Sequence, residues 1–434
     1  MTRPEPHWYA LGNLGSNIFS QAFATYAIFF YIDHLRGPVG AITAALAVQS
    51  IWHAVLNPMI GQLSDRTRTK RGRRVPYIAV LSLPLGVIFV LMWHPLVSHS
   101  GLAWYFLMIV VLFDLTYLAV VLNWTSLFPE MFRTIQTRSR AQSPRQAIGI
   151  VALIIGVAVP PLLYGHFGWT AMGIILGSIG TAGFLLSLIG VKEASTLNIS
   201  LRQSSPTNLR TSWHLIRTSQ GFGQFLGTNF LVQLTLGIIP AVLPFYAKYV
   251  LHASHSMLSS LLASIFVVAL IAVVPWTRWI RRKGSHHAIL WAIGWLSLGV
   301  IPLIFAPNIF WALTGAILLG IGLAGFLVLA DVLISEVIDQ DAHQQGTRRE
   351  GIFYGINGFI LRLGVSIQAL LLYVVLHFSG YYANSMGIAP PLTRLGFRAL
   401  AGIVPLFLLL GAWFLIRNFN VPQSPAEWVE SPEA

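Results

Sequence analysis

Cysteine is absent from the 434 residues, so the chain can form no disulfide and carries no thiol chemistry. Charged residues are also scarce, at 9% of the chain against about 25% in soluble domains. Acidic residues are the scarcer charge, with 14 Asp and Glu against 27 Lys and Arg. Because 55% of the residues are hydrophobic, the composition excludes an ordinary soluble protein.

Motifs of soluble enzymes are missing as well. The sequence contains no phosphate-binding loop, no zinc-type spacing of His and Glu, and no nucleophile elbow. We therefore expect no enzyme, no cofactor and no direct use of ATP. A net charge of +13 would suggest a nucleic-acid partner in a soluble chain, but here the basic residues gather in particular loops. The positive-inside rule accounts for them without a nucleic acid.

Long hydrophobic runs dominate what is present. A membrane span needs about 20 apolar residues, and the sequence contains twelve such candidates. They lie near 9–33, 40–64, 76–95, 102–128, 145–167, 169–191, 222–250, 256–280, 287–306, 309–337, 351–378 and 396–417. The predicted fold is therefore an all-α membrane protein with twelve transmembrane helices in a lipid bilayer.

A polar stretch divides these spans six and six. We predict a six-helix bundle over 1–191, a cytoplasmic linker over 192–221, a second six-helix bundle over 222–417 and a polar tail over 418–434. Most Lys and Arg fall in loops on one side, which predicts that both termini are cytoplasmic. The expected location is the plasma (inner) membrane, as a multi-pass protein.

Two charged residues stand out because they lie deep inside predicted spans. Asp114 and Arg362 each lie about 12 residues into a span, near the bilayer midplane at about 1.5 Å per residue. Burial there costs about 2.5–3.5 kcal/mol on insertion scales, so each residue needs a reason. Arg362 is interpreted as an anchor for a polar or anionic ligand, or as half of a structural ion pair. Asp114 is either the partner of Arg362 or a proton-titrating group.

His53 and Asn57 lie four residues apart in the second span and share a helix face. An unperturbed His titrates near pH ~6.5, which permits proton coupling, although a structural hydrogen bond is the alternative.

The first span carries a polar stripe with a four-residue spacing: Asn13, Asn17, Gln21 and Thr25. This stripe predicts a water-filled cavity, with hydrogen bonding between packed helices as the alternative. Aromatic faces for a ring-shaped ligand are available in Tyr26, Trp124 and Tyr354.

Three motifs carry a resemblance to a known family. The first runs from Asn57-Pro58 through Gly61, Asp65-Arg66-Thr67 and Gly72-Arg73-Arg74 to Pro76. The second is Phe128-Pro129-Glu130-Met131 followed by Arg138 and Arg145, and the third is Ala330-Asp331-Val332 followed by Gly346 to Gly351 and Arg362-Leu363-Gly364. In their order and spacing the sequence resembles the glycoside–pentoside–hexuronide:cation symporters of the major facilitator superfamily.

The resemblance implies a twelve-helix alternating-access bundle, mostly monomeric, that takes up a sugar or glycoside with Na⁺, Li⁺ or H⁺. Melibiose-type members have sugar-binding Asp at the positions of Asn17 and Val121, and cation-binding Asp at those of His53 and Asn57. Arg145 matches a sugar-site Arg, and Arg362 takes the place of a Lys.

The missing carboxylates change the expected chemistry. Asn57 offers a neutral oxygen and His53 a nitrogen, so Na⁺ coupling is disfavoured; H⁺ coupling through His53 or Asp114, and uncoupled diffusion, stay open. A cationic, acid-poor cavity favours an anionic substrate such as a hexuronide. The expected substrate contacts are Asn17, Gln21, Trp124, Arg145, Asn357 and Arg362.

The first motif is expected to act as a cytoplasmic gate that locks one state and releases the other. Its residues are Gly61, Asp65, Arg66, Gly72 and Arg73, in a loop with six Lys or Arg within nine residues. Two alternatives remain open at this point. One is a lipid or amphiphile carrier of the same fold, and the other is a polytopic sensor or assembly protein without transport.

Overall fold

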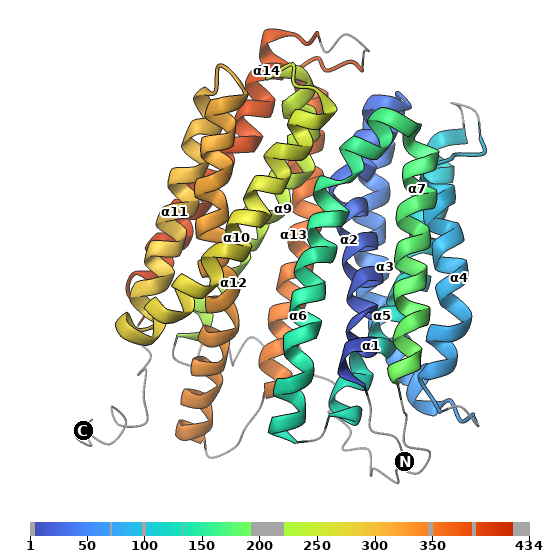
Figure 1. The fold of residues 1–434 in the computed structure, drawn as a ribbon. Coiled ribbons are helices and arrows are strands. Elements are labelled where there is room, and N and C mark those ends of the chain that lie inside the picture. Colours follow the sequence, from blue (N-terminus) through green and yellow to red (C-terminus); the bar gives the residue numbers. More distant parts are fainter. Residues whose placement is uncertain are drawn as a thin grey trace. The chain divides into compact units, whose positions relative to one another are not determined.

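The computed structural model describes residues 5–69, 72–97, 101–132, 134–191, 221–345, 350–383 and 388–419. Within these ranges the secondary structure is helical and contains no strand, which confirms the predicted all-α class. Figure 1 shows the long helices running roughly parallel within each part of the chain.

The chain packs into two compact units. Unit 1 comprises Met1–Ile199, Leu243–Ala263 and Ala369–Arg394, and unit 2 comprises Ser200–Val242, Ser264–Gln368 and Leu395–Ala434. Short pieces from the second half of the sequence therefore pack within unit 1. The division of the sequence into residues 1–191 and 222–417 stays a prediction. Nearly all of the predicted linker and tail, 192–220 and 420–434, lies outside the described residues.

Unit 1 contains the helices of the first half of the sequence. These are α1 (Pro6–Ala10), α2 (Gly12–Ile28), the π-helix η1 (Phe29–His34), α3 (Val39–Arg66), α4 (Val75–Met92), α5 (Leu102–Met131), α6 (Ile135–Ala158), α7 (Pro160–Ser187) and the 3-10 turn η3 (Leu188–Gly190).

Unit 2 holds most of the second half. Its helices are α9 (Phe222–Tyr249), α10 (His255–Lys283), α11 (Ser285–Phe305), α12 (Ile309–Gln345), α13 (Glu350–Phe378), α14 (Pro391–Arg398), the π-helix η4 (Ala399–Ile403) and α15 (Val404–Ile416). Four of them, α9, α10, α13 and α14, also contribute residues to unit 1. Within unit 2, α11 packs along α12, where the hydroxyl of Ser285 donates to Glu336 Oε2 at 2.8 Å.

Twelve crossings follow from these helices. Eleven helices of the described residues are long and apolar enough to span a bilayer. The first predicted span is made of α2, with 17 residues, followed directly by the six residues of η1. At about 1.5 Å per residue the two together exceed a hydrocarbon core of about 30 Å.

The predicted break between the fifth and sixth spans lies at Gly168. This residue has φ +83° inside α7, a conformation that glycine adopts without steric cost. Before Gly168 the chain runs along α2 in the direction of α6, and Gly156 lies against Gln21. After Gly168 the chain runs in the opposite direction, with Gly173 against Trp93 and Gly183 against Leu14. The chain therefore reverses at Gly168, as Figure 1 shows where α6 passes into α7.

The helix of the fifth span begins about ten residues, nearly three helical turns, before its apolar run. We expected it near residue 145, but α6 starts at Ile135. Thr134 caps the helix by accepting a hydrogen bond from the backbone N–H of Thr137, and the Thr137 hydroxyl accepts in return from the backbone of Thr134. This capping box stabilises a polar first turn that hydrophobicity alone does not reveal.

Candidate functional site

A buried carboxylate lies in the middle of unit 1. Asp114 belongs to α5 and its side chain is 4% exposed. Its Oδ1 accepts a hydrogen bond from Gln49 Nε2 at 3.1 Å and lies 2.6 Å from His53 Nδ1. Gln49 and His53 stand one turn apart on α3, so both side chains reach α5 from the same face.

This arrangement brings two of the predicted coupling residues together. Asp114 forms an ion pair with His53 of the same unit. A pairing of Asp114 with Arg362, one of the two predicted roles of this carboxylate, stays a prediction. Asn57 lies one turn further along α3 and is half-buried. Gln49 was not predicted, although its four-residue spacing from His53 was the available signal.

The net charge of the His53 and Asp114 pair depends on whether the pair carries a proton. A neutral imidazole beside an ionised carboxylate carries one negative charge in a buried place, which is costly unless it is compensated. Addition of one proton makes the pair neutral overall. Asp114 Oδ2 is buried and has no hydrogen-bond partner among the described residues, so the carboxylate has an unused acceptor in this conformation.

Arg145 lies on two aromatic rings. Its guanidinium carbon is 5.0 Å from the ring centre of Trp124 and 4.9 Å from that of Phe128. Within the described part of the chain, no carboxylate forms an ion pair with Arg145. Cation–π contacts of this kind orient the guanidinium without using its N–H donors, which stay available to a carboxylate.

Trp124 differs from its expected role as an open face for a sugar ring. It is 1% exposed and stacks on Tyr9 at 5.0 Å with an interplanar angle of 15°. The indole N–H donates to the Tyr9 carbonyl at 3.2 Å, and the Tyr9 hydroxyl donates to the Trp124 carbonyl at 2.8 Å. In this structure Trp124 therefore positions Arg145, and Tyr9 is a further residue of the cluster that the sequence did not reveal.

The absence of a side chain at Gly12 leaves room for Trp124. A Cβ at Gly12 would stand 2.2 Å from the indole nitrogen, closer than any real contact. We expect Gly12→Ala to displace Trp124 and with it Arg145, and so to weaken substrate binding about as much as the loss of the Arg145 contact itself. The measurement is the substrate concentration at half-maximal uptake in membranes that contain equal amounts of protein.

Gly294 supplies the matched control, because a Cβ there meets nothing within 4 Å. Gly294→Ala should leave uptake unchanged, since in a helix this substitution alone favours the fold by a fraction of a kcal/mol, about 0.5–1. Equal effects of the two substitutions would mean that the packing of Trp124 against Gly12 does not position Arg145.

The polar stripe of the first span packs largely on a neighbouring helix. Asn13 Nδ2 donates to the Arg145 carbonyl of α6, and Asn17 Nδ2 donates to the Asn13 carbonyl at 3.1 Å. Gln21 lies against Gly156 of α6, and Thr25 is 1% exposed. Only the Asn13 hydrogen bond joins two helices, because the Asn17 bond stays within α2 and the buried Thr25 hydroxyl has no partner among the described residues. Asn17 and Gln21 keep partly exposed side chains, so both interpretations of the stripe stay open.

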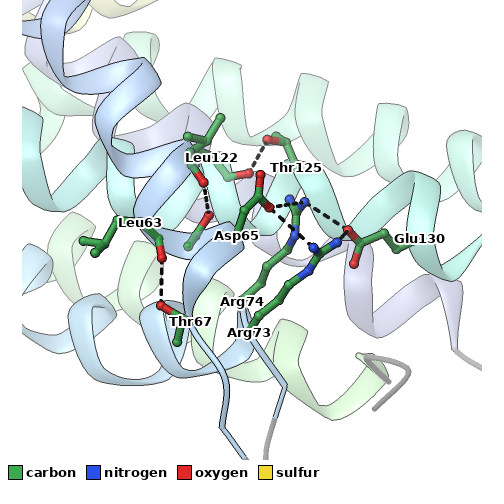
Figure 2. A network of polar contacts seen from close by, with 10 residues as sticks. Leu63, Asp65, Thr67, Arg73, Arg74, Leu122, Thr125 and Glu130 are labelled. Atoms are coloured by element: carbon green, nitrogen blue, oxygen red, sulfur yellow. Dashed lines mark hydrogen bonds and ion pairs between the residues drawn. The ribbon is translucent and has the colours of Figure 1, made fainter. Parts of the chain in front are cut away.

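Figure 2 shows the ion-pair network of the first motif. Asp65 at the end of α3 faces the guanidinium groups of Arg73 and Arg74, with closest distances of 3.6 and 3.4 Å. Both arginines also reach Glu130 of α5, at 2.5 Å from Arg73 and 3.0 Å from Arg74. The network ties the end of α3 and the start of α4 to the end of α5.

One member of this network, Glu130, was not among the predicted gate residues, whereas Arg74 belongs to the first motif. Gly72 has φ +102°, in the left-handed region, within the turn that brings the arginines back toward Asp65. Gly61 lies on α3 where the chain faces Leu122 of α5, and Arg66 is exposed at the helix end. The remaining predictions for Gly61, Arg66 and Gly72 as gate residues stay predictions.

Unit 2 carries its own predicted residues. Asn357 of α13 accepts a hydrogen bond through Oδ1 from Asn229 Nδ2 of α9 at 2.8 Å, and Asn229 is 3% exposed. Arg362 is half-buried on α13, a little more than one turn beyond Asn357. Tyr354 of the same helix is 48% exposed. The roles of Asn357 and Arg362 in substrate binding stay predictions.

Comparison with known proteins decides the family. Residues 8–423 match the family model described as MFS/sugar transport protein. The chain belongs to this family. Among its relatives, the isoprimeverose transporter of Lactiplantibacillus pentosus is 26% identical over 87% of this chain and 80% of its own length. The glucuronide carrier protein homolog of Escherichia coli (strain K12) is 23% identical over 94% of this chain and 90% of its own length.

The fold agrees with solved transporters of the superfamily. The crystal structure of the nucleoside transporter NupG matches with a TM-score of 0.69 at 12% identity, over 95% of this chain and 99% of that one. The chain is therefore a multi-pass secondary transporter of the sugar-transport type and not an enzyme. The family identification confirms the resemblance drawn from the three motifs.

Proposed function

We propose that this transporter takes up an anionic sugar, a hexuronide or its glycoside, together with one proton. The observation that carries the proposal is the buried pair of His53 and Asp114. It occupies the helix position at which the family resemblance implies cation-binding carboxylates. In this chain the carboxylate stands on α5 instead, and the α3 positions supply an imidazole and amides.

The chemistry of the pair favours H⁺ over Na⁺. A sodium site uses several oxygen ligands, whereas Asp114 Oδ1 is already engaged by a nitrogen of His53 and by the amide of Gln49. A proton needs one basic atom, and its binding removes the net charge from a buried place. The protonated pair is thus the form suited to a change of conformation in which this region stays dry.

Arg145 supports the choice of an anionic substrate. Its guanidinium is oriented by Trp124 and Phe128, and among the described residues it has no carboxylate partner. A carboxylate of the substrate can complete a bidentate contact with the unused N–H groups. The E. coli relative, a glucuronide carrier protein homolog, agrees with this chemistry.

The network of Asp65, Arg73, Arg74 and Glu130 is proposed as the cytoplasmic gate. Such pairs are individually weak, of the order of 0–1 kcal/mol, which suits a contact that opens in every cycle. We further propose, from the distribution of Lys and Arg in the sequence, that this end of unit 1 faces the cytoplasm and that the protein lies in the plasma membrane.

The proposal is tested by comparing the uptake of methyl β-D-glucuronide with that of methyl β-D-glucoside in proteoliposomes with a pH gradient. The uronide should be preferred, and a gradient of Na⁺ at constant pH should not drive it. A preference for the neutral glucoside that is unaffected by Arg145→Gln and by Arg362→Gln would contradict the anionic substrate.

A further inference from the structure

A cavity lies at the end of unit 1 opposite the Asp65 network. It measures about 500 Å³, within the usual range of about 300–1,000 Å³ for small-molecule sites. Its wall comes from η1, the end of α4, the turn at Gly168, the end of α9 and the start of α10. All of these segments belong to unit 1. We call this cavity the vestibule, and the residues used below are Asp33, His34, His94, Trp169, Lys248 and His255.

The floor of the vestibule is a closed polar cluster. Asp33 is 5% exposed and accepts hydrogen bonds from Lys248 Nζ at 2.5 Å, from the Tyr249 hydroxyl at 2.5 Å and from the Tyr381 hydroxyl at 2.7 Å. These contacts join η1 to the ends of α9 and α13. The Lys248 charge is balanced by Asp33, so the floor presents little net charge to a ligand.

The rim of the vestibule consists of imidazoles. His34, His94 and His255 are exposed and come from three different elements. His94 Nδ1 lies 3.1 Å from the hydroxyl of Thr170. Each neutral imidazole offers one donor and one acceptor, as sugar hydroxyls do. The His, Asp and Glu side chains of the described residues form no group of three that could hold a metal ion.

One wall of the vestibule is aromatic. Trp169 stacks on Tyr164 at 4.0 Å with an interplanar angle of 7°, and on Trp93 at 5.6 Å with an angle of 15°. This stack is rigid, since its members are at most 8% exposed. The stack therefore bounds and shapes the vestibule, and the groups that can meet a pyranose ring with its rim of hydroxyls are the neutral hydrogen-bonding imidazoles.

We propose that the vestibule binds the pyranose ring of the substrate as a separate outer site, ahead of the transport site near Arg145. The proposal rests on the proposed function, because it takes the transported molecule to be a sugar. The two sites recognise different parts of the sugar: the vestibule contacts the ring hydroxyls, whereas Arg145 contacts the carboxylate. Methyl β-D-glucuronide and methyl β-D-glucoside should therefore both bind there.

Carbethoxylation of the imidazoles tests this site directly. The purified protein in nanodiscs is treated with diethyl pyrocarbonate at increasing concentrations of each glycoside, and modification is quantified by mass spectrometry. We expect saturable protection of His34, His94 and His255. His7, an exposed imidazole of α1 outside the vestibule lining, should stay reactive as the internal control. The protection should persist in Arg145→Gln, because the two sites are separate.

A double variant separates direct contact from a conformational effect. His34→Leu with His94→Leu removes two hydrogen-bonding groups from the exposed rim, and the glycoside concentration that half-protects His255 should rise about tenfold. The matched variant His7→Leu, at an exposed imidazole of α1, should leave it unchanged. Equal reactivity of His255 with and without glycoside, an unchanged midpoint in the double variant, or loss of all protection in Arg145→Gln would overturn the vestibule site.

Uptake of both glycosides by the same preparation in proteoliposomes shows whether the proposed function falls with it. Uptake without protection of the imidazoles would overturn the vestibule site alone. Absence of both uptake and protection would overturn the vestibule site and also the proposal that the transported molecule is a sugar.

Discussion

Replacement of Asp114 by asparagine is expected to abolish proton-driven accumulation of substrate while exchange across the membrane continues. The amide keeps the shape of the carboxylic acid and can still meet Gln49 and His53, so the fold should be retained. An amide cannot release a proton, and the site therefore behaves as if it were permanently protonated. The measurement compares accumulation driven by a pH gradient with counterflow exchange in the same proteoliposomes.

Accumulation in Asp114→Asn should stop at equal concentrations on the two sides, and counterflow should remain comparable to that of the parent protein. Glu5→Gln, which removes an exposed carboxylate of the same unit, serves as the control and should accumulate normally. Normal accumulation by Asp114→Asn would mean that the proton is carried elsewhere. Loss of both activities with a normal thermal stability would assign Asp114 to the conformational change instead of to coupling.

Replacement of Arg145 by glutamine is expected to weaken uronide transport far more than transport of a neutral glycoside. A hydrogen bond to a charged group contributes about 1.5–3 kcal/mol, so the KM for methyl β-D-glucuronide should rise about 10- to 100-fold. The KM for methyl β-D-glucoside should change several-fold at most. The measurement is initial uptake of the two labelled sugars over a range of concentrations.

Arg140 offers a matched control on the same helix, because it is an exposed arginine five residues before Arg145. Arg140→Gln should leave both KM values unchanged while it removes the same charge from α6. If Arg145→Gln raised both KM values equally, the guanidinium would contact a part of the sugar that the two substrates share, and the anionic selectivity would have another source.

The helices could be predicted from the sequence because a bilayer imposes length and apolarity on each crossing. The reversal at Gly168 was predicted for the same reason, since it separates two apolar runs. The start of α6 at Ile135 was not predicted, because the first turns of this helix are polar and its cap consists of two threonines. A short polar extension of a membrane helix leaves no mark on the hydrophobic pattern.

The polar contacts were predictable only in part. His53 and Asp114 were each singled out because ionisable groups in a span need a reason, but their contact joins helices 61 residues apart in sequence. The same holds for Arg73 and Glu130, which stand 57 residues apart. The stripe from Asn13 to Thr25 has a spacing that fits both a cavity and a helix contact. The sequence alone could not distinguish the cavity from the helix contact, because the position of Asn13 against α6 depends on how the helices pack.

The proposed stoichiometry has an electrical consequence. A uronide carries one negative charge and the pair of His53 and Asp114 carries one proton, so the loaded transporter moves no net charge. Uptake of the uronide should therefore respond to a pH gradient and be insensitive to membrane potential. Transport of a neutral glycoside with the same proton should instead be stimulated by a potential that is negative inside.

Internal pH of proteoliposomes during uptake of methyl β-D-glucuronide tests the central claim most directly. With a pH-sensitive dye inside, no Na⁺ present and the potential clamped, addition of the uronide should acidify the lumen in the parent protein, and the signal should be absent in Asp114→Asn. Uronide uptake without any change of internal pH, or uptake that requires Na⁺, would contradict proton coupling through His53 and Asp114.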